Sequence, residues 1–89
     1  MTTRDMVVQC EQGLQLRVAS TVAGVARDHR ATSVKVSCGE CQKANACSIL
    51  ELLSLEAHRG TRLEVVVEGP DEAIVLKSLT EIFEHGGGI

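Results

Sequence analysis

The sequence predicts an α+β domain in which a four-stranded sheet is covered on one face by three helices. Two observations lead to this prediction. Segments with strand and helix patterning follow one another along the 89 residues in the order β-α-β-β-α-β-α, and each helical segment is apolar on one side only. A chain of this length holds one hydrophobic core, so we expect a single domain over residues 1–89.

The first strand is expected at residues 4–10 (RDMVVQC), and residues 11–13 form a loop. A helix should follow over residues 16–29, because small and apolar residues recur there at helical spacing. This buried face consists of Ala19, Val22, Ala23 and Ala26. The opposite, outer face carries Arg17, Ser20, Gly24 and Arg27. The helix is therefore expected to be amphipathic.

The middle of the chain predicts a β-hairpin. Val34 and Val36 alternate with polar residues over 32–37, as in a half-buried strand. Gly39 can adopt the positive φ of a hairpin turn, so a short return strand is expected at about 41–44.

Two further helices flank the last strand. Ser48 and Glu51 have the spacing of a capping box, so a second helix should begin there and end at 58–60. The strongest strand pattern covers 61–68, after which Pro70 and Asp71 open the last helix. The apolar face of that helix is expected to contain Ile74, Val75, Leu76, Leu79, Ile82 and Phe83. Residues 85–89 are expected to form a flexible tail.

Composition excludes several functional classes. With one Phe and no Tyr or Trp, the core must be aliphatic, and no aromatic platform can stack on nucleic-acid bases. A net charge of −3 also argues against a nucleic-acid binder. The apolar runs are too short to span a membrane, and the first residues lack an apolar signal region, so a cytoplasmic location is expected. Without a signal for secretion, the four cysteines are expected to be reduced.

Two separated motifs, GLQLRVA at 13–19 and NACSILELLSL at 45–55, resemble those of HPr, the phosphocarrier of the bacterial sugar phosphotransferase system. The resemblance extends from about Met6 to Glu84. It implies an open-faced β-sandwich with an antiparallel sheet in strand order 1-4-2-3. The matching residues are Gly13, Leu14, Arg17, Ala19, Gly39, Asn45, Ala46, Ser48, Ile49, Ser54, Leu55, Gly60 and Thr61.

This chain departs from the HPr pattern at the position that matters most. Where the family has a phosphoryl-accepting histidine, it has Gln15, and where the family has a proline it has Val18. An amide nitrogen is delocalised into its carbonyl and cannot attack phosphorus. His29, His58 and His85 are expected to lie away from the start of the first helix. We therefore expect no phosphoryl relay, no enzymatic activity and no catalytic residue. We also expect no cofactor and no metal site.

Gln15 makes the chain similar to the catabolite-repression HPr paralogues, which lack the histidine. The resemblance implies regulation through Ser48, phosphorylated by HPr kinase, and binding to a transcription regulator or a phosphotransferase enzyme. A phosphate there would face the N-terminus of the second helix, although Glu51 would compete for the same donors. The same serine can equally be a plain N-cap.

A protein-contact surface is expected on the first and second helices. Leu16, Arg17 and Ser20 would contribute the first part of it, with Arg17 available to an anion or a partner carboxylate. The second helix has more aliphatic residues than one buried stripe needs. Leu52 and Leu55 can face the sheet, which leaves Ile49, Leu50 and Leu53 partly exposed.

Three other hypotheses fit the residues. The chain could be a drifted paralogue that competes with the true phosphocarrier. It could be a thiol redox or metal-binding module that uses Cys38 and Cys41, although one CxxC pair lacks the four ligands of a structural zinc site. It could also be a domain that acts only beside a separate enzyme.

Overall fold

The computed structural model describes residues 1–9, 16–38 and 42–84. The elements follow the predicted order along the chain. They are β1 (Thr2–Val7), α1 (Leu16–Asp28), β2 (Ser33–Cys38), β3 (Gln42–Asn45), α2 (Ile49–Ser54), β4 (Arg62–Glu68) and α3 (Glu72–Glu84). The predicted hairpin turn at Gly39 and the predicted tail at 85–89 lie outside the described residues.

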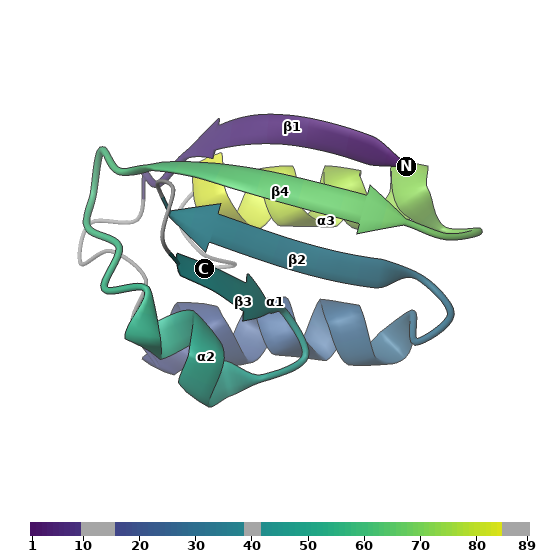
Figure 1. Ribbon diagram of the computed structural model, residues 1–89, viewed down its shortest axis with the longest axis horizontal. Helices are drawn as coiled ribbons and strands as arrows, with labels where there is room; N and C mark the ends of the chain where they lie inside the picture. Colours follow the sequence, from purple (N-terminus) through teal and green to yellow (C-terminus); the bar gives the residue numbers. More distant parts are fainter. Residues whose placement is uncertain (10–15, 39–41, 85–89) are drawn as a thin grey trace.

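The strands form one antiparallel sheet in the order β1-β4-β2-β3, which confirms the topology that the resemblance implied. The strand that comes last in the sequence, β4, lies between β1 and β2, so β1 and β3 are the two edges (Figure 1). Helices α1 and α3 lie behind the sheet, and α2 contacts α1 and β3 at the lower edge. The other face of the sheet carries no helix in the described part of the chain, which makes the sandwich open-faced.

The hydrophobic core lies between the sheet and the helices, and it is aliphatic as predicted. Strand β4 shows why: Leu63, Val65 and Val67 are completely buried, whereas Arg62 and Glu64 alternate with them on the open face. The predicted inner face of α1 is buried together with Val18. Phe83, the single aromatic residue, is fully buried at the end of α3.

The bounds of the first strand differ from those expected. It runs from Thr2 to Val7 rather than over 4–10, because its register with β4 already begins at Thr2 and Val67. The regular pairing ends at Val7 and Arg62, which are the last residue of β1 and the first residue of β4. Val8 still exchanges backbone hydrogen bonds with Gly60 and Thr61, at 2.7 and 2.9 Å. Cys10 lies outside the described residues.

The second helix ends earlier than expected. It stops at Ser54, and Glu56 then adopts a φ of 52°, in the left-handed region that terminates a helix. The Glu56 N–H donates to the Leu53 carbonyl at 3.2 Å, which closes the last turn. Leu55 and Ala57, on either side of Glu56, are both buried in the core.

The last helix begins at Glu72, directly after the predicted opening signal. The Val75 N–H donates to the Asp71 carbonyl at 2.9 Å, so Asp71 is the residue at which the helix starts to form its hydrogen bonds. Most of the predicted apolar face is buried, but Ile74 is 57% exposed. Ile74 lies one residue before the buried stripe and points away from the sheet. No helix in the described part of the chain combines the length and the apolar character that crossing a membrane requires.

Two loops cross at the end of the sheet where α1 finishes and α3 starts. The buried Thr32 hydroxyl accepts a 3.0 Å hydrogen bond from the Asp71 N–H, and His29 Nδ1 lies 2.8 Å from Asp71 Oδ2. Gly69 has a φ of 149°, and a Cβ built there would lie 2.5 Å from the Thr32 Cα. Only glycine lets the two backbones approach so closely.

Gly69→Ala should therefore destabilise the fold by about 2 kcal/mol or more, because the backbone of Thr32 cannot yield as a flexible side chain would. Gly24→Ala is the matched control. Gly24 lies in α1, and a Cβ added there would have no other part of the fold within 4 Å, so alanine should stabilise by about 0.5–1 kcal/mol. Urea unfolding of both variants tests this, and equal effects would contradict it.

Glu72 ties the start of α3 to the start of β1. Its carboxylate accepts a 2.6 Å hydrogen bond from the Thr2 hydroxyl and a 3.4 Å bond from the Gly69 N–H, and it lies 3.4 Å from the Met1 amino group. These interactions, the Thr2 bond first, lower the pKa of Glu72 below its ordinary value of 4.5.

A carboxyl group with a lowered folded-state pKa stabilises the fold at neutral pH, and this contribution is lost as the pH falls from 4.5 through the folded-state pKa. Glu72→Gln should hence lower the free energy of unfolding at pH 7 and have a smaller effect in acid. Urea unfolding of both chains between pH 7 and pH 3 measures the difference. A difference that stays constant over this range would contradict the assignment.

Candidate functional site

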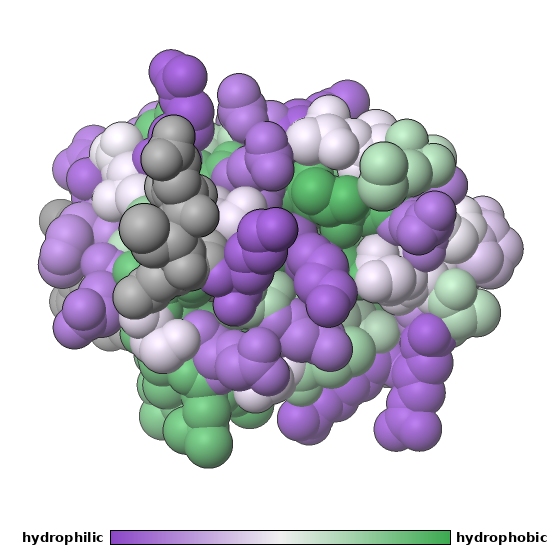
Figure 2. Space-filling view, in the orientation of Figure 1, coloured by the Kyte–Doolittle hydropathy of each residue, from purple (hydrophilic) through white to green (hydrophobic). Residues whose placement is uncertain are grey.

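The predicted contact surface lies where α2 packs along α1. The two helices are in contact, and Figure 1 shows α2 in front of the first half of α1. Leu16, the first residue of α1, is 62% exposed, and Leu50 of α2 is 80% exposed. In Figure 2 apolar atoms project at the lower edge of the molecule, where α2 lies. Two large aliphatic side chains therefore face solvent from neighbouring helices.

The remaining aliphatic residues of α2 divide between core and surface as the spacing suggests. Leu52 is fully buried, and Leu55, which follows the helix, is also buried. Ile49 and Leu53 are half-buried and pack against the core from its margin. They present only part of their own surface to solvent.

Polar residues of α1 border this apolar surface. Arg17 and Ser20 are exposed on the outer face of the helix, together with Gly24 and Arg27. Within the described residues the Arg17 side chain forms no ion pair. Gln15, directly before the helix, lies outside the described residues.

Ser48 caps α2. Its φ and ψ of −107° and 111° are extended, and its side-chain oxygen accepts a 3.3 Å hydrogen bond from the Glu51 N–H. Its carbonyl accepts from the Leu52 N–H at 3.1 Å, the first backbone bond of the helix. The side chain is half-buried, so the hydroxyl is held at the surface rather than enclosed.

The capping box predicted from Ser48 and Glu51 is only half formed. The Glu51 carboxylate does not bond to the Ser48 N–H, which instead donates to the Asn45 carbonyl at 2.9 Å. Glu51 Oε1 accepts a 3.1 Å bond from the Asn45 N–H, and Asn45 Oδ1 accepts a 3.0 Å bond from the Cys47 N–H. The tight turn before the helix therefore gives the Glu51 carboxylate a hydrogen bond from the Asn45 N–H rather than from the Ser48 N–H.

Arg27 belongs to this region, although its position in the sequence predicted no role for it. Its Nε donates a 3.2 Å hydrogen bond to the Cys47 carbonyl, the peptide group that joins Cys47 to Ser48. A cation is thereby held beside the serine by the neighbouring helix. The helical spacing of the sequence placed Arg27 on the same outer face of α1 as Arg17 and Ser20. Only the packing of α2 on α1 brings the Cys47 carbonyl to it as a partner.

The histidines are placed differently from one another. His29 follows the end of α1, opposite the end where Gln15 precedes the helix, as expected. His58 lies in the loop between α2 and β4, where its backbone N–H donates to the Thr61 hydroxyl at 3.0 Å. The Gly60 N–H in the same loop bonds to the Val8 carbonyl, which holds the loop against the end of β1. His85 lies outside the described residues.

The cysteine motif is only partly described. Cys38 and Cys47 are half-buried free thiols, whereas Cys10 and Cys41 lie outside the described residues. Across residues 1–9, 16–38 and 42–84 there is no group of three or more acidic, cysteine or histidine side chains placed to hold a metal ion. The hypothesis of a thiol or metal module thus gains no support from the arrangement of these residues.

Comparison with known proteins gives consistent results. The family model described as PTS HPr component phosphorylation site matches residues 2–85. The phosphocarrier protein HPr of Borreliella burgdorferi is 29% identical over 84 residues, which cover 94% of this chain and 95% of that protein.

Two solved structures extend the comparison. An HPr from Thermoanaerobacter tengcongensis superposes with a TM-score of 0.89 at 26% identity, covering 100% of this chain and 98% of that one. Crh, the Bacillus subtilis catabolite repression containing protein, superposes with a TM-score of 0.71 at 28% identity, covering 96% and 95%; that protein was crystallised as a swapped, intertwined dimer.

Proposed function

Because this chain belongs to the HPr family of the phosphotransferase system, we propose that it acts there as a regulatory protein-binding domain and not as a phosphoryl carrier. The observation that carries the proposal is Gln15, at the position where the resemblance places the phosphoryl-accepting histidine. A carboxamide has no nucleophilic lone pair on nitrogen, so it forms no stable bond to phosphorus. Recognition is then the remaining role for the surrounding surface.

The proposed contact surface consists of Leu16, Arg17, Ser20, Ile49, Leu50 and Leu53. The strong exposure of Leu16 and Leu50 supports it, because large aliphatic side chains at neighbouring surface positions are typical of protein contacts. Arg17 adds a cation that can pair with a partner carboxylate. The partners we propose are HPr kinase, a transcription regulator or an enzyme of the phosphotransferase system.

We further propose that phosphorylation of Ser48 switches this surface. Three features support the proposal: the hydroxyl lies at the molecular surface, the Glu51 carboxylate is engaged by Asn45, and Arg27 supplies a cation nearby. A phosphate would add about two negative charges beside the exposed Leu50. The switch would change the charge of the contact surface while the helix retains its N-cap oxygen. We place the domain in the cytoplasm and assign it no cofactor, metal or catalytic residue.

The loss of phosphoryl transfer can be tested with the general phosphotransferase enzyme and labelled phosphoenolpyruvate. The chain should acquire no acid-labile label, because no imidazole is present at position 15 to attack phosphorus. Gln15→His is the matched gain-of-function variant and should become labelled. Label on the unaltered chain would overturn the proposal, and mapping it to His58 would identify that loop as the acceptor. Slowing of a true HPr relay by the unlabelled chain would favour the competing-paralogue hypothesis.

The Ser48 switch requires a separate experiment with HPr kinase and ATP. One phosphate should be incorporated, as measured by intact mass, and Ser48→Asn should incorporate none. Asparagine is the appropriate control because it caps a helix as well as serine does, whereas alanine would cost about 1 kcal/mol of stability. Incorporation that persists in Ser48→Asn, or no incorporation into the unaltered chain, would contradict the switch without affecting the loss of phosphoryl relay.

A further inference from the structure

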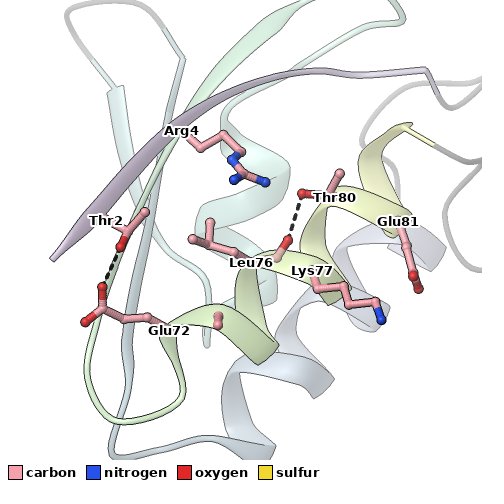
Figure 3. A pocket seen from close by; sticks show the side chains of 8 residues that line it. Thr2, Arg4, Glu72, Leu76, Lys77, Thr80 and Glu81 are labelled. Atoms are coloured by element: carbon pink, nitrogen blue, oxygen red, sulfur yellow. Dashed lines mark hydrogen bonds between the residues drawn. The ribbon is translucent and has the colours of Figure 1, made fainter.

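A groove of about 550 Å³ lies on the side of the molecule opposite α2, between edge strand β1 and helix α3 (Figure 3). Thr2 and Arg4 form its strand side. One stripe of α3 forms its helix side: Glu72, Ala73, Leu76, Lys77, Thr80 and Glu81. None of these residues belongs to the proposed contact surface on α1 and α2, so the groove is a second, independent feature.

Strand β1 offers an unpaired backbone edge beside this groove. Among the described strands it pairs with β4 alone, so the N–H and C=O groups of alternate residues on its outer side have no strand partner. An extended segment added to such an edge gains backbone hydrogen bonds, and every second side chain of that segment enters the adjoining groove.

The ends of the groove define the length of segment that fits. Thr2 bonds to Glu72 at one end of the groove at 2.6 Å, and beyond its other end the Gln9 N–H bonds to the Phe83 carbonyl at 2.8 Å. Strand and helix therefore run in the same general direction. The α3 stripe from Glu72 to Glu81 is about 13–14 Å long, which corresponds to about four extended residues.

The side chains of the groove define the chemistry of its occupant. Leu76 is nearly buried and forms an apolar floor, whereas the Arg4 guanidinium extends over the groove from β1 (Figure 3). Arg4 occupies the strand face that Met6 fills with a buried apolar side chain two residues later. It forms no ion pair with any described residue, and the Glu72 carboxylate is already held by Thr2 and Gly69. Lys77 and Glu81 add one charge of each sign on the helix side. The groove thus offers an apolar contact next to Arg4, a cation with no ion-pair partner among the described residues.

We propose that the β1 edge and this groove bind an extended acidic segment of a partner protein. The segment would add to the sheet as a fifth strand, with an aliphatic side chain over Leu76 and, two residues away, a carboxylate bonded to Arg4. A second copy of the chain fits less well, because pairing of two β1 edges would bring two Arg4 side chains to the same seam. The guanidinium thereby disfavours self-pairing while it selects an acidic partner.

The experiment uses the full chain and a synthetic hexapeptide, TVTETV, acetylated and amidated, whose alternate residues present Val, Glu and Val to the groove. Titration followed by amide chemical shifts should perturb β1 and α3 and leave α1 and α2 unchanged. The peptide TVTQTV should bind about fivefold more weakly, since its amide forms no charge-assisted bond with Arg4. Two further peptides carry N-methyl groups on one or the other set of alternate residues. Only one set of N–H groups faces the β1 edge, so one of these peptides should lose at least about tenfold in affinity.

Arg4→Gln should weaken TVTETV binding by about fivefold and leave TVTQTV binding unchanged, whereas Arg62→Gln on the open face of the sheet is the matched control with no effect on either. Circular dichroism of both variants verifies that they fold. No shift at β1 or α3 at millimolar peptide would overturn the proposal. Equal binding of both N-methylated peptides would also overturn it, as would full displacement of TVTETV by acetate at equal concentration. Concentration-dependent shifts of β1 without peptide would overturn it too, and would identify a second copy of the chain as the occupant.

Discussion

Pairing of β4 with both β1 and β2 is the constraint on which the rest of the structure depends. Leu63, Val65 and Val67 are fully buried on one face of this central strand, and a one-residue slip would turn all three to solvent. Because β4 comes late in the sequence, the first strand cannot join the sheet until most of the chain is present. Because β4 lies between β1 and β2, the pair of β2 and β3 lies at the opposite side of the sheet from β1.

The central position of β4 creates two sheet edges with different surroundings. At the β3 edge, α2 packs on α1 and presents Leu50 beside Leu16, which is the surface we propose for regulatory partners. At the β1 edge, α3 stops short of covering the strand and leaves the groove beneath Arg4. The two surfaces are separated by the width of the sheet, so one partner at each would not compete for the same residues.

The turn before α2 shows how one set of contacts serves both stability and the proposed switch. Ser48 caps the helix, while Asn45 holds the Glu51 carboxylate and Arg27 holds the Cys47 carbonyl. All of these hydrogen bonds would stabilise the turn even if it had no regulatory role. They also leave the serine hydroxyl at the surface, with the Glu51 carboxylate bonded to Asn45 and the Arg27 cation nearby, and a neighbouring cation favours a phosphate.

By itself, the sequence determined the order of the elements, the inner face of α1, the cap at Ser48 and the absence of a histidine at position 15, because each depends on local spacing or residue identity. It also placed Ile74 wrongly in the core. It extended α2 too far, because neither the last predicted turn of that helix nor Glu56 carries a local signal strong enough to end the helix. Only the tertiary structure decided that Glu51 bonds Asn45, that Arg27 reaches Cys47 and that Arg4 overhangs a groove. These contacts join segments that meet only when the sheet and helices pack. The hydrophobic periodicity of one segment predicts its own secondary structure and buried face, but it does not predict which residues of other segments will lie beside it.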